Sequence, residues 1–162
     1  MIRICQTSFY RLFILCVFSF LTSNLALAHS SAKAEEKQIE KAYLGWCAAI
    51  GSAKGDPSIV VKYYAPNATL LPTLSTKILR NKDHGMDEYF TQLTSHQNIK
   101  CIPEKMDIHF DKHLAINSGL YAFSYTNKDG KQIVIPARFT FVYRKVGDDW
   151  LIVTHHSSKM PE

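Results

Sequence analysis

The sequence of 162 residues lacks a long apolar stretch, a basic cluster and a rich set of cysteines. Its apolar run at residues 12–21 has ten residues, whereas an ordinary membrane-spanning helix needs about 20. No cluster of lysines and arginines indicates nucleic-acid binding. No internal repeat, low-complexity linker or second domain is visible. These absences, together with the length, favour one globular domain with its own core.

The N-terminal segment has the three parts of a secretory signal peptide. A positively charged start (residues 1–11) precedes the apolar run at residues 12–21, and Ala26-Leu27-Ala28 forms an A-x-A cleavage signature. The sequence therefore predicts a signal peptide over residues 1–28 and a periplasmic or secreted protein. The mature chain is expected to begin at His29, with residues 29–162 forming a single domain.

Removal of this segment would change both the charge and the cysteine content. The net charge falls from +5 to +3, because the segment contains two arginines and no acidic residue. Two of the four cysteines also leave, so that Cys47 and Cys101 remain in the expected chain of 134 residues. In an oxidising compartment these two form a disulfide bond, or they stay as two buried thiols; the sequence leaves both readings open.

The first half of the mature chain has a helical pattern. In residues 34–53 the apolar positions follow one face of an amphipathic helix: Ile39, Tyr43, Trp46, Cys47 and Ile50. Asp56-Pro57 predicts the start of a short helix over residues 58–64. Asp83 is the expected cap of a third helix that runs to residue 93.

After residue 95 the apolar period changes from about 3.6 to about 2. The expected strands cover residues 68–71, 78–80, 105–114, 115–125, 131–145 and 150–157. Three helices followed by antiparallel strands predict an α+β fold, with the helices packed on one face of the sheet. The strand at residues 131–145 is longer than usual, so the sheet must bend, and a bent sheet around helices makes a cone with an internal pocket.

Several segments resemble bacterial relatives of the calcium/calmodulin-dependent protein kinase II association domain. They are ARFTFVYR at 137–144, WLIV at 150–153 and HHSSKMP at 155–161, with Trp46, GDP at 55–57, YAPNA at 64–68 and LLPTLS at 70–75 upstream. The resemblance spans residues 39–161. It implies the SnoaL-like, nuclear transport factor 2-like fold, a cone-shaped α+β barrel. It also implies a homodimer or higher oligomer that assembles through the outer face of the curved sheet.

The resemblance does not extend to a kinase. The sequence has no Gly-rich ATP loop, no catalytic Asp loop and no Asp-Phe-Gly motif, and 134 residues are too few for a kinase domain. Some relatives are labelled as SgcJ/EcaC-type oxidoreductases, but no Gly-rich dinucleotide fingerprint or haem motif supports redox chemistry. No cofactor is therefore expected.

Arg138 is the sharpest candidate for a ligand-binding residue. It lies in the middle of a strand among apolar and aromatic neighbours, where a charge is costly unless it is paired. A guanidinium at the base of a cone would bind a carboxylate in a bidentate manner. The resemblance implies cavity arginines that hold small carboxylates in the kinase members, although these fall on neighbouring positions. The alternatives are an internal salt bridge and an exposed face.

His155 and His156 are adjacent on an expected strand and therefore point to opposite faces. One of them is a candidate base or hydrogen-bond donor in the pocket, and a packed, hydrogen-bonded histidine is the alternative. By simple alternation, His155 shares a face with Leu151 and Val153, and His156 shares the other with Trp150 and Ile152.

Trp46, Tyr64 and Tyr143 are the aromatic candidates for lining the pocket, because an indole N–H or a tyrosine hydroxyl adds a polar group to an apolar surface. Asp107, His109, Asp111 and His113 alternate on one expected strand, about 6.6 Å apart. That spacing suits no single ion, so no metal site is expected. We expect these four residues to form a solvated face or an interface.

Two classes of function remain. The first is an exported, dimeric ligand-binding or assembly domain, whose ligand is small and anionic if Arg138 binds it. The second is a pocket enzyme of the isomerase, dehydratase or cyclase kind, with a histidine and a tyrosine or arginine in the cone. No acid–base pair can be assembled, because the acids fall mainly at turns, caps and the polar strand face. The sequence therefore favours binding or assembly and identifies no catalytic residue.

Overall fold

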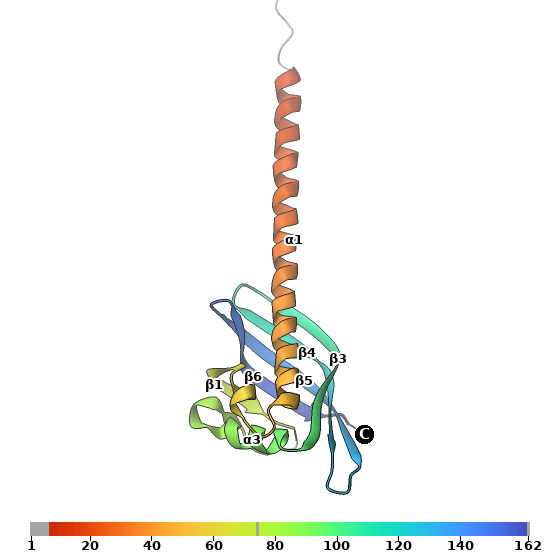
Figure 1. Ribbon diagram of the computed structural model, residues 1–162. Helices are drawn as coiled ribbons and strands as arrows, with labels where there is room; N and C mark the ends of the chain where they lie inside the picture. The colour runs from red at the N-terminus through yellow and green to blue at the C-terminus, as the bar shows by residue number, and fades with distance from the viewer. Residues whose placement is uncertain (1–6, 74, 162) are drawn as a thin grey trace, which may run out of the picture. The chain divides into compact units, whose positions relative to one another are not determined.

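A computed structural model describes residues 7–73 and 75–161 of the chain, with side chains from residue 30 onward. Figure 1 shows the elements. The helical segments are α1 (Thr7–Ser52), α2 (Ser58–Val61), the 3₁₀ helix η1 (Asn81–Asp83) and α3 (Gly85–Thr94). The strands are β1 (Tyr64–Leu71), β2 (Leu79–Arg80), β3 (Gln97–Phe110), β4 (Leu114–Thr126), β5 (Gln132–Val146) and β6 (Asp149–Lys159).

The chain divides into two compact units, Met1–Lys37 and Gln38–Glu162. The first contains the predicted signal peptide, of which residues 1–6 lie outside the described residues. The predicted cleavage point before His29 falls within α1, and the signal peptide stays a prediction. In the part of the chain that the structure describes, no helix is both long and apolar enough to cross a membrane.

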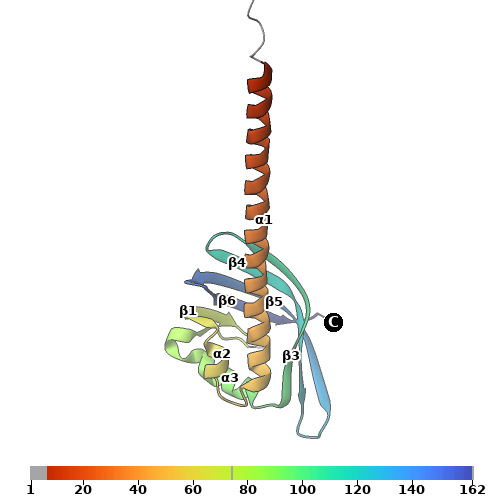
Figure 2. The same cartoon turned by 45° about the horizontal axis from the view of Figure 1, so that its top comes forward.

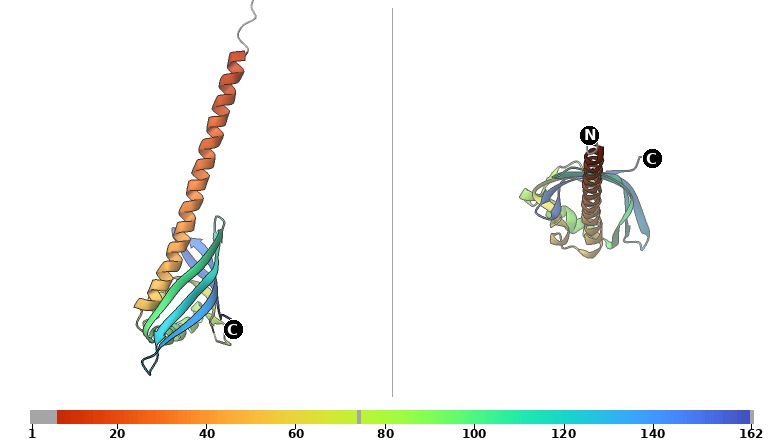
Figure 3. Two further views of the ribbon diagram at one scale, coloured as in Figure 1. Left: turned by 90° about the vertical axis from the view of Figure 1, so that its right-hand side faces the viewer. Right: turned by 90° about the horizontal axis from the view of Figure 1, so that it is seen from above.

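The second unit is built on a curved sheet. Six strands of the described chain are ordered β2-β1-β6-β5-β4-β3, with β1 parallel to β6 and all other neighbours antiparallel. The strands arch around the part of α1 that belongs to this unit, while α2 and α3 lie near one end of the sheet (Figures 2 and 3). The predicted α+β class, with helices packed against a curved sheet, is confirmed; the sheet is antiparallel as predicted except for the parallel pair β1 and β6.

The core lies between α1 and the concave face of the sheet. The α1 residues predicted to form one face are all buried, with Ile39, Tyr43, Trp46 and Ile50 at most 1 % exposed. Tyr43 stacks on Phe139 of β5 at a centroid distance of 4.9 Å. Cys47 of α1 is joined by a disulfide bond to Cys101 of β3, across a Cα–Cα distance of 5.1 Å. The pairing that the sequence left open thus ties the helix to an outer strand of the sheet.

A bulge in β3 reverses the strand's inward and outward positions. The register with β4 shifts between Pro103 and Lys105, so Met106 pairs with Gly119. A Cβ at Gly119 would lie 2.0 Å from the carbonyl oxygen of Lys105, so only glycine fits where the strands approach so closely. A bulge inserts one unpaired residue and turns the following side chains to the other face. Ile108, beyond the bulge, therefore faces the core.

Some predicted boundaries differ from the structure. β3 starts eight residues earlier than expected, since its first half lacks alternation and contains Pro103. The short helix ends at Val61, and Tyr64 already belongs to β1. Asp83 lies in η1, and the cap of α3 is His84 with φ 54°. Asp111 lies in the turn after β3, where its carboxylate accepts the N–H groups of His113 and Leu114.

Candidate functional site

The structure separates the predicted site residues into two groups. Trp46, Tyr64, Tyr143 and His155 are at most 3 % exposed and belong to the core on the concave side of the sheet. Arg138 and His156 are exposed. Arg138 pairs with Leu120 on one side and Ser158 on the other, on the convex face. The six residues do not form one pocket.

A second bulge decides which histidine faces inward. The register between β5 and β6 shifts so that Tyr143 pairs with Ile152, but Val142 pairs with Thr154. Simple alternation, which placed His155 with Leu151, is therefore wrong beyond this point. His155 shares the concave face with the buried Trp150 and Ile152. Strict alternation could not show this, because a bulge adds one residue to one strand only.

His155 lies in a buried chain of hydrogen bonds, here called the His155 network: Trp46, Tyr64, His155, Tyr121, Ser157 and Thr73. Trp46 Nε1 donates to the Tyr64 hydroxyl at 3.1 Å. The Tyr64 hydroxyl lies 2.8 Å from His155 Nδ1, and the Tyr121 hydroxyl lies 3.4 Å from His155 Nε2. Tyr121 donates to Ser157 Oγ at 2.6 Å. Both ring nitrogens of His155 therefore have a partner.

Trp46, at one end of the His155 network, fixes which groups donate and which accept the hydrogen bonds. An indole N–H can only donate, so Tyr64 accepts from Trp46 and must use its single proton elsewhere. That proton fits His155 Nδ1, which places the proton of a neutral imidazole on Nε2, facing Tyr121. Every donor in the chain then meets an acceptor, from the indole to Ser157.

The far end of the network is closest to solvent. Ser157 Oγ is hydrogen-bonded to Thr73 Oγ1, and Thr73 is only half-buried. Sequence reasoning did not single out Tyr121 and Ser157 as site residues. Tyr121 was one of many tyrosines, and Ser157 could have been found as the residue two positions beyond His155 on the same strand face.

Aromatic rings hold the imidazole in place. His155 stacks on Phe141 at a centroid distance of 4.0 Å, and Trp46 meets it edge-on at 5.2 Å. Such packing leaves the ring little freedom to leave its hydrogen bonds. The network is therefore a rigid arrangement of polar groups inside an aromatic core.

The electrostatics keep the network uncharged. Burial, together with the smaller effect of the neighbouring His156, lowers the pKa of His155 to about 3. Burial also raises the pKa of the Tyr64 and Tyr121 hydroxyls. The buried polar side chains of the described residues are Thr94, Asn117, Ser124, His155 and Ser157, so none of them is a carboxylate, lysine or arginine. The network can hold and orient neutral groups but offers no ionised acid–base pair near neutral pH.

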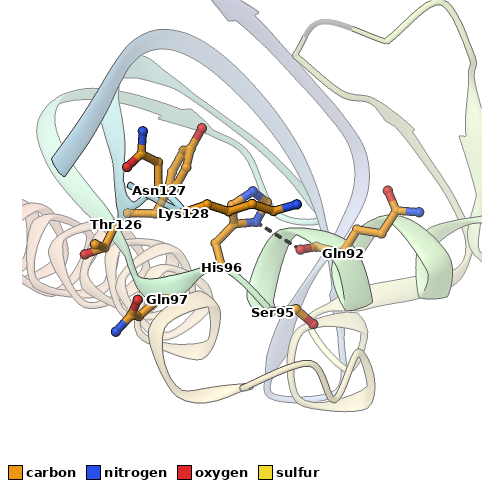
Figure 4. A pocket seen from close by; sticks show the side chains of 8 residues that line it. Gln92, Ser95, His96, Gln97, Thr126, Asn127 and Lys128 are labelled. Carbon is orange, nitrogen blue, oxygen red and sulfur yellow. Dashed lines mark hydrogen bonds between the residues drawn. The ribbon is translucent and has the colours of Figure 1, made fainter. Parts of the chain in front are cut away.

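An open pocket lies on the surface, away from the predicted site residues. It has a volume of about 380 Å³ and is lined by Gln92, Ser95, His96, Gln97, Tyr125, Thr126, Asn127 and Lys128 (Figure 4). His96 Nδ1 donates to the carbonyl oxygen of Gln92 at 3.0 Å, which fixes the ring orientation. The lining side chains are mostly polar and exposed.

The polar face predicted on β3 is exposed in the structure. The carboxylate Oδ2 of Asp107 lies 3.1 Å from His109 Nε2, and both side chains are exposed to solvent. Within the described residues, no group of three or more His, Cys, Asp or Glu side chains is placed to hold a metal ion.

Solved structures share the fold. A protein from Streptomyces avermitilis, of the nuclear transport factor 2-like (NTF2-like) family and provisionally assigned as a dehydratase, superposes with a TM-score of 0.70. It is 13% identical, over 80% of this chain and 99% of that one. A ketosteroid isomerase-like protein from Erwinia carotovora atroseptica gives a TM-score of 0.62 at 17% identity, over 78% and 96% of the two chains. These similarities confirm the predicted cone-shaped, nuclear transport factor 2-like fold.

A closer similarity identifies the family. A Xanthomonas campestris protein, provisionally assigned as a calcium/calmodulin dependent protein kinase II association domain, is 34% identical with a TM-score of 0.69. The match covers 76% of this chain and 86% of that one. No curated protein matches the chain. The family model of the calcium/calmodulin dependent protein kinase II association domain matches residues 35–161. The chain therefore belongs to the calcium/calmodulin dependent protein kinase II association domain family.

Proposed function

We propose that this protein is an exported, dimeric assembly domain that also binds a small molecule in its cone, without kinase activity. Membership of an association-domain family supports self-assembly. The signal-peptide pattern of residues 1–28 supports export to the periplasm or beyond the cell.

The observation that best supports self-assembly is the composition of the convex face. Large apolar side chains are exposed on the outward positions of β3, β4 and β5: Ile102 40%, Leu114 43%, Ile116 45%, Val134 53% and Val146 51%. Strand pairing places Ile116 opposite Val142, near the start of β4 and close to Leu114. Exposed large apolar side chains gathered on one face of a sheet favour an interface on that face. On this view Arg138 and His156 belong to the face that meets a second copy of the chain.

A pocket enzyme of the isomerase, dehydratase or cyclase kind is the second candidate. It is favoured by His155, which lies within hydrogen-bond distance of two tyrosine hydroxyls inside the cone. Three features rank it second. Both ring nitrogens are already engaged, the pKa of His155 is lowered to about 3 by burial, and no buried carboxylate accompanies it among the described residues. A general base works best when its pKa is near the working pH.

Sedimentation equilibrium of the protein expressed from the whole sequence tests the dimer. We expect a dimer at micromolar concentration, and mass spectrometry of the same sample identifies its N-terminus. The variant Ile116→Asp places a charge among the exposed apolar side chains of the convex face and is expected to sediment as a monomer.

The matched control is Ile78→Asp, because Ile78 is 58% exposed and lies before β2, outside the strands that form the convex face. This variant should remain a dimer, and circular dichroism should show both variants to be folded. A wild-type monomer at about ten micromolar, or an Ile116→Asp variant that stays dimeric, would contradict the proposed assembly.

A further inference from the structure

Three buried side chains in the core have polar atoms without a hydrogen-bond partner. They are the hydroxyls of Tyr43 and Tyr143 and both amide atoms of Asn117, within the part of the chain whose side chains are described. Each of the three residues is fully buried. A buried polar group without a partner is costly, so such groups need an explanation.

The three side chains lie around one residue, Phe141. Asn117 of β4 pairs with Phe141 of β5 in the sheet. Tyr143, the next inward residue of β5, stacks on Phe141 at a centroid distance of 5.8 Å. Tyr43 of α1 meets Phe141 edge-on, also at 5.8 Å. Helix and sheet thus bring these three side chains to one region of the cone.

Other polar groups in the same core do have hydrogen-bond partners, as the His155 network shows. There the indole N–H, both imidazole nitrogens and two tyrosine hydroxyls all have partners. A leucine at position 117 would fill similar space without leaving amide atoms unpaired. The unpaired Asn117 is therefore better explained by something that it binds than by packing.

The charges around these atoms define what would fit. Burial raises the pKa of Tyr143 and of Tyr43, and the negative charge of Glu104 raises that of Tyr43 further, so both hydroxyls stay neutral. The described buried side chains include no cation. A carboxylate would have no counter-charge here. An uncharged head group that both donates and accepts hydrogen bonds would match two hydroxyls and an amide.

The neighbouring surface of β3 is apolar and only partly covered. Beyond the bulge, Ile108 pairs with Asn117, and Phe110 pairs with Ala115, which in turn pairs with Tyr143. Met106, Ile108 and Phe110 are half-buried and pack against the core. They would contact the apolar part of a molecule whose polar end reaches the three side chains.

We propose that Tyr43, Asn117 and Tyr143 form a binding site for a small uncharged molecule, with an alcohol, phenol or amide head and an apolar body against Met106, Ile108 and Phe110. This proposal deepens the ligand-binding part of the proposed function and does not depend on the dimer. It also names a different ligand class from the anion that Arg138 suggested in the sequence.

Thermal unfolding with one-ring probes tests the site. Phenol and benzamide, which have uncharged polar heads, should raise the melting temperature of the protein by about 2 °C or more at saturation. Toluene, which has no polar head, and benzoate, which is charged, should have less than half of this effect. In ¹⁵N-resolved NMR spectra, phenol should shift the side-chain amide signal of Asn117.

Variants that remove single polar groups make the test specific. Asn117→Leu and Tyr143→Phe should each reduce the phenol effect at least threefold, while the melting temperature without phenol should not fall. Tyr125→Phe, the matched control at a half-buried tyrosine elsewhere, should respond as the wild type does. If Asn117→Leu fails to fold, Tyr143→Phe and Tyr43→Phe decide, because each removes one oxygen only.

Equal stabilisation of wild type and variants by phenol would overturn the proposal. The absence of any stabilisation by phenol and benzamide would also overturn it, and ordered water would then be the only occupant of the site. Sedimentation of the same samples separates this outcome from failure of the proposed assembly. Loss of the probe effect in a protein that is still dimeric contradicts the site alone.

Discussion

The concave and convex faces of the same sheet differ most clearly at two adjacent histidines. His155 is 3% exposed, stacks on Phe141 and has partners at both ring nitrogens. His156 is exposed on the other face and pairs in the sheet with Thr140. Two adjacent histidines on one strand thus have different surroundings because they lie on opposite faces of the sheet. The bulge in β6 determines which of the two lies on the concave face.

The largest expected effect is a contrast between two alanine variants. His155→Ala removes a buried ring and leaves the Tyr64 and Tyr121 hydroxyls without their partner, so it should lower the free energy of unfolding by about 3 kcal/mol. His156→Ala should lower it by less than about 0.5 kcal/mol, since the side chain is exposed. Urea unfolding followed by circular dichroism measures both. Equal losses would remove the distinction between the faces.

The pH dependence of stability should report on the buried histidine of the concave face. Burial lowers the pKa of His155 from 6.5 to about 3 in the folded protein. Between these values the unfolded chain binds a proton that the folded protein does not. Stability should therefore fall as the pH falls, by about 1.4 kcal/mol per pH unit, and His155 should contribute no slope above its unfolded pKa.

The difference in unfolding free energy between wild type and His155→Ala isolates this contribution, because other groups cancel. It should grow as the pH rises from about 4 to about 6 and then level off. A His155 difference that is independent of pH would show that the buried imidazole does not resist protonation.

A smaller effect should distinguish two tyrosines. Tyr121→Phe removes the hydroxyl between His155 and Ser157, so we expect a loss of about 1–2 kcal/mol in the free energy of unfolding. Tyr125→Phe removes the hydroxyl of a half-buried tyrosine outside the network and should cost about 0.5 kcal/mol or less. Urea unfolding of the two variants side by side provides the measurement. Similar losses would indicate that the network adds nothing to stability.

The order of helices and strands could be predicted from the sequence because each periodic segment is long. The apolar face of α1, from Ile39 to Ile50, is as expected. So is the opposite orientation of His155 and His156. The family resemblance, drawn from the motifs at the C-terminal end, is confirmed over residues 35–161.

The candidate site could be predicted only in part. Trp46 and Tyr64 do lie beside His155, but Arg138 lies on the convex face, because its place in β5 alternates with the buried Ala137 and Phe139. The bulges in β3 and β6 depend on how neighbouring strands meet, which the sequence of one strand does not show. Asn117 was missed for another reason: alternation along β4 places it on the face of Tyr121 and Phe123, but an asparagine is usually exposed. Its burial becomes apparent only in the folded sheet, where it pairs with Ile108 and Phe141.

The protonation state of His155 is the central claim about the core, and long-range ¹⁵N–¹H NMR of the imidazole rings measures it directly. The structure predicts a neutral ring with its proton on Nε2, and signals of His155 that do not change between about pH 5 and pH 8. A proton on Nδ1, or a His155 signal that titrates within this range, would contradict the account of the His155 network.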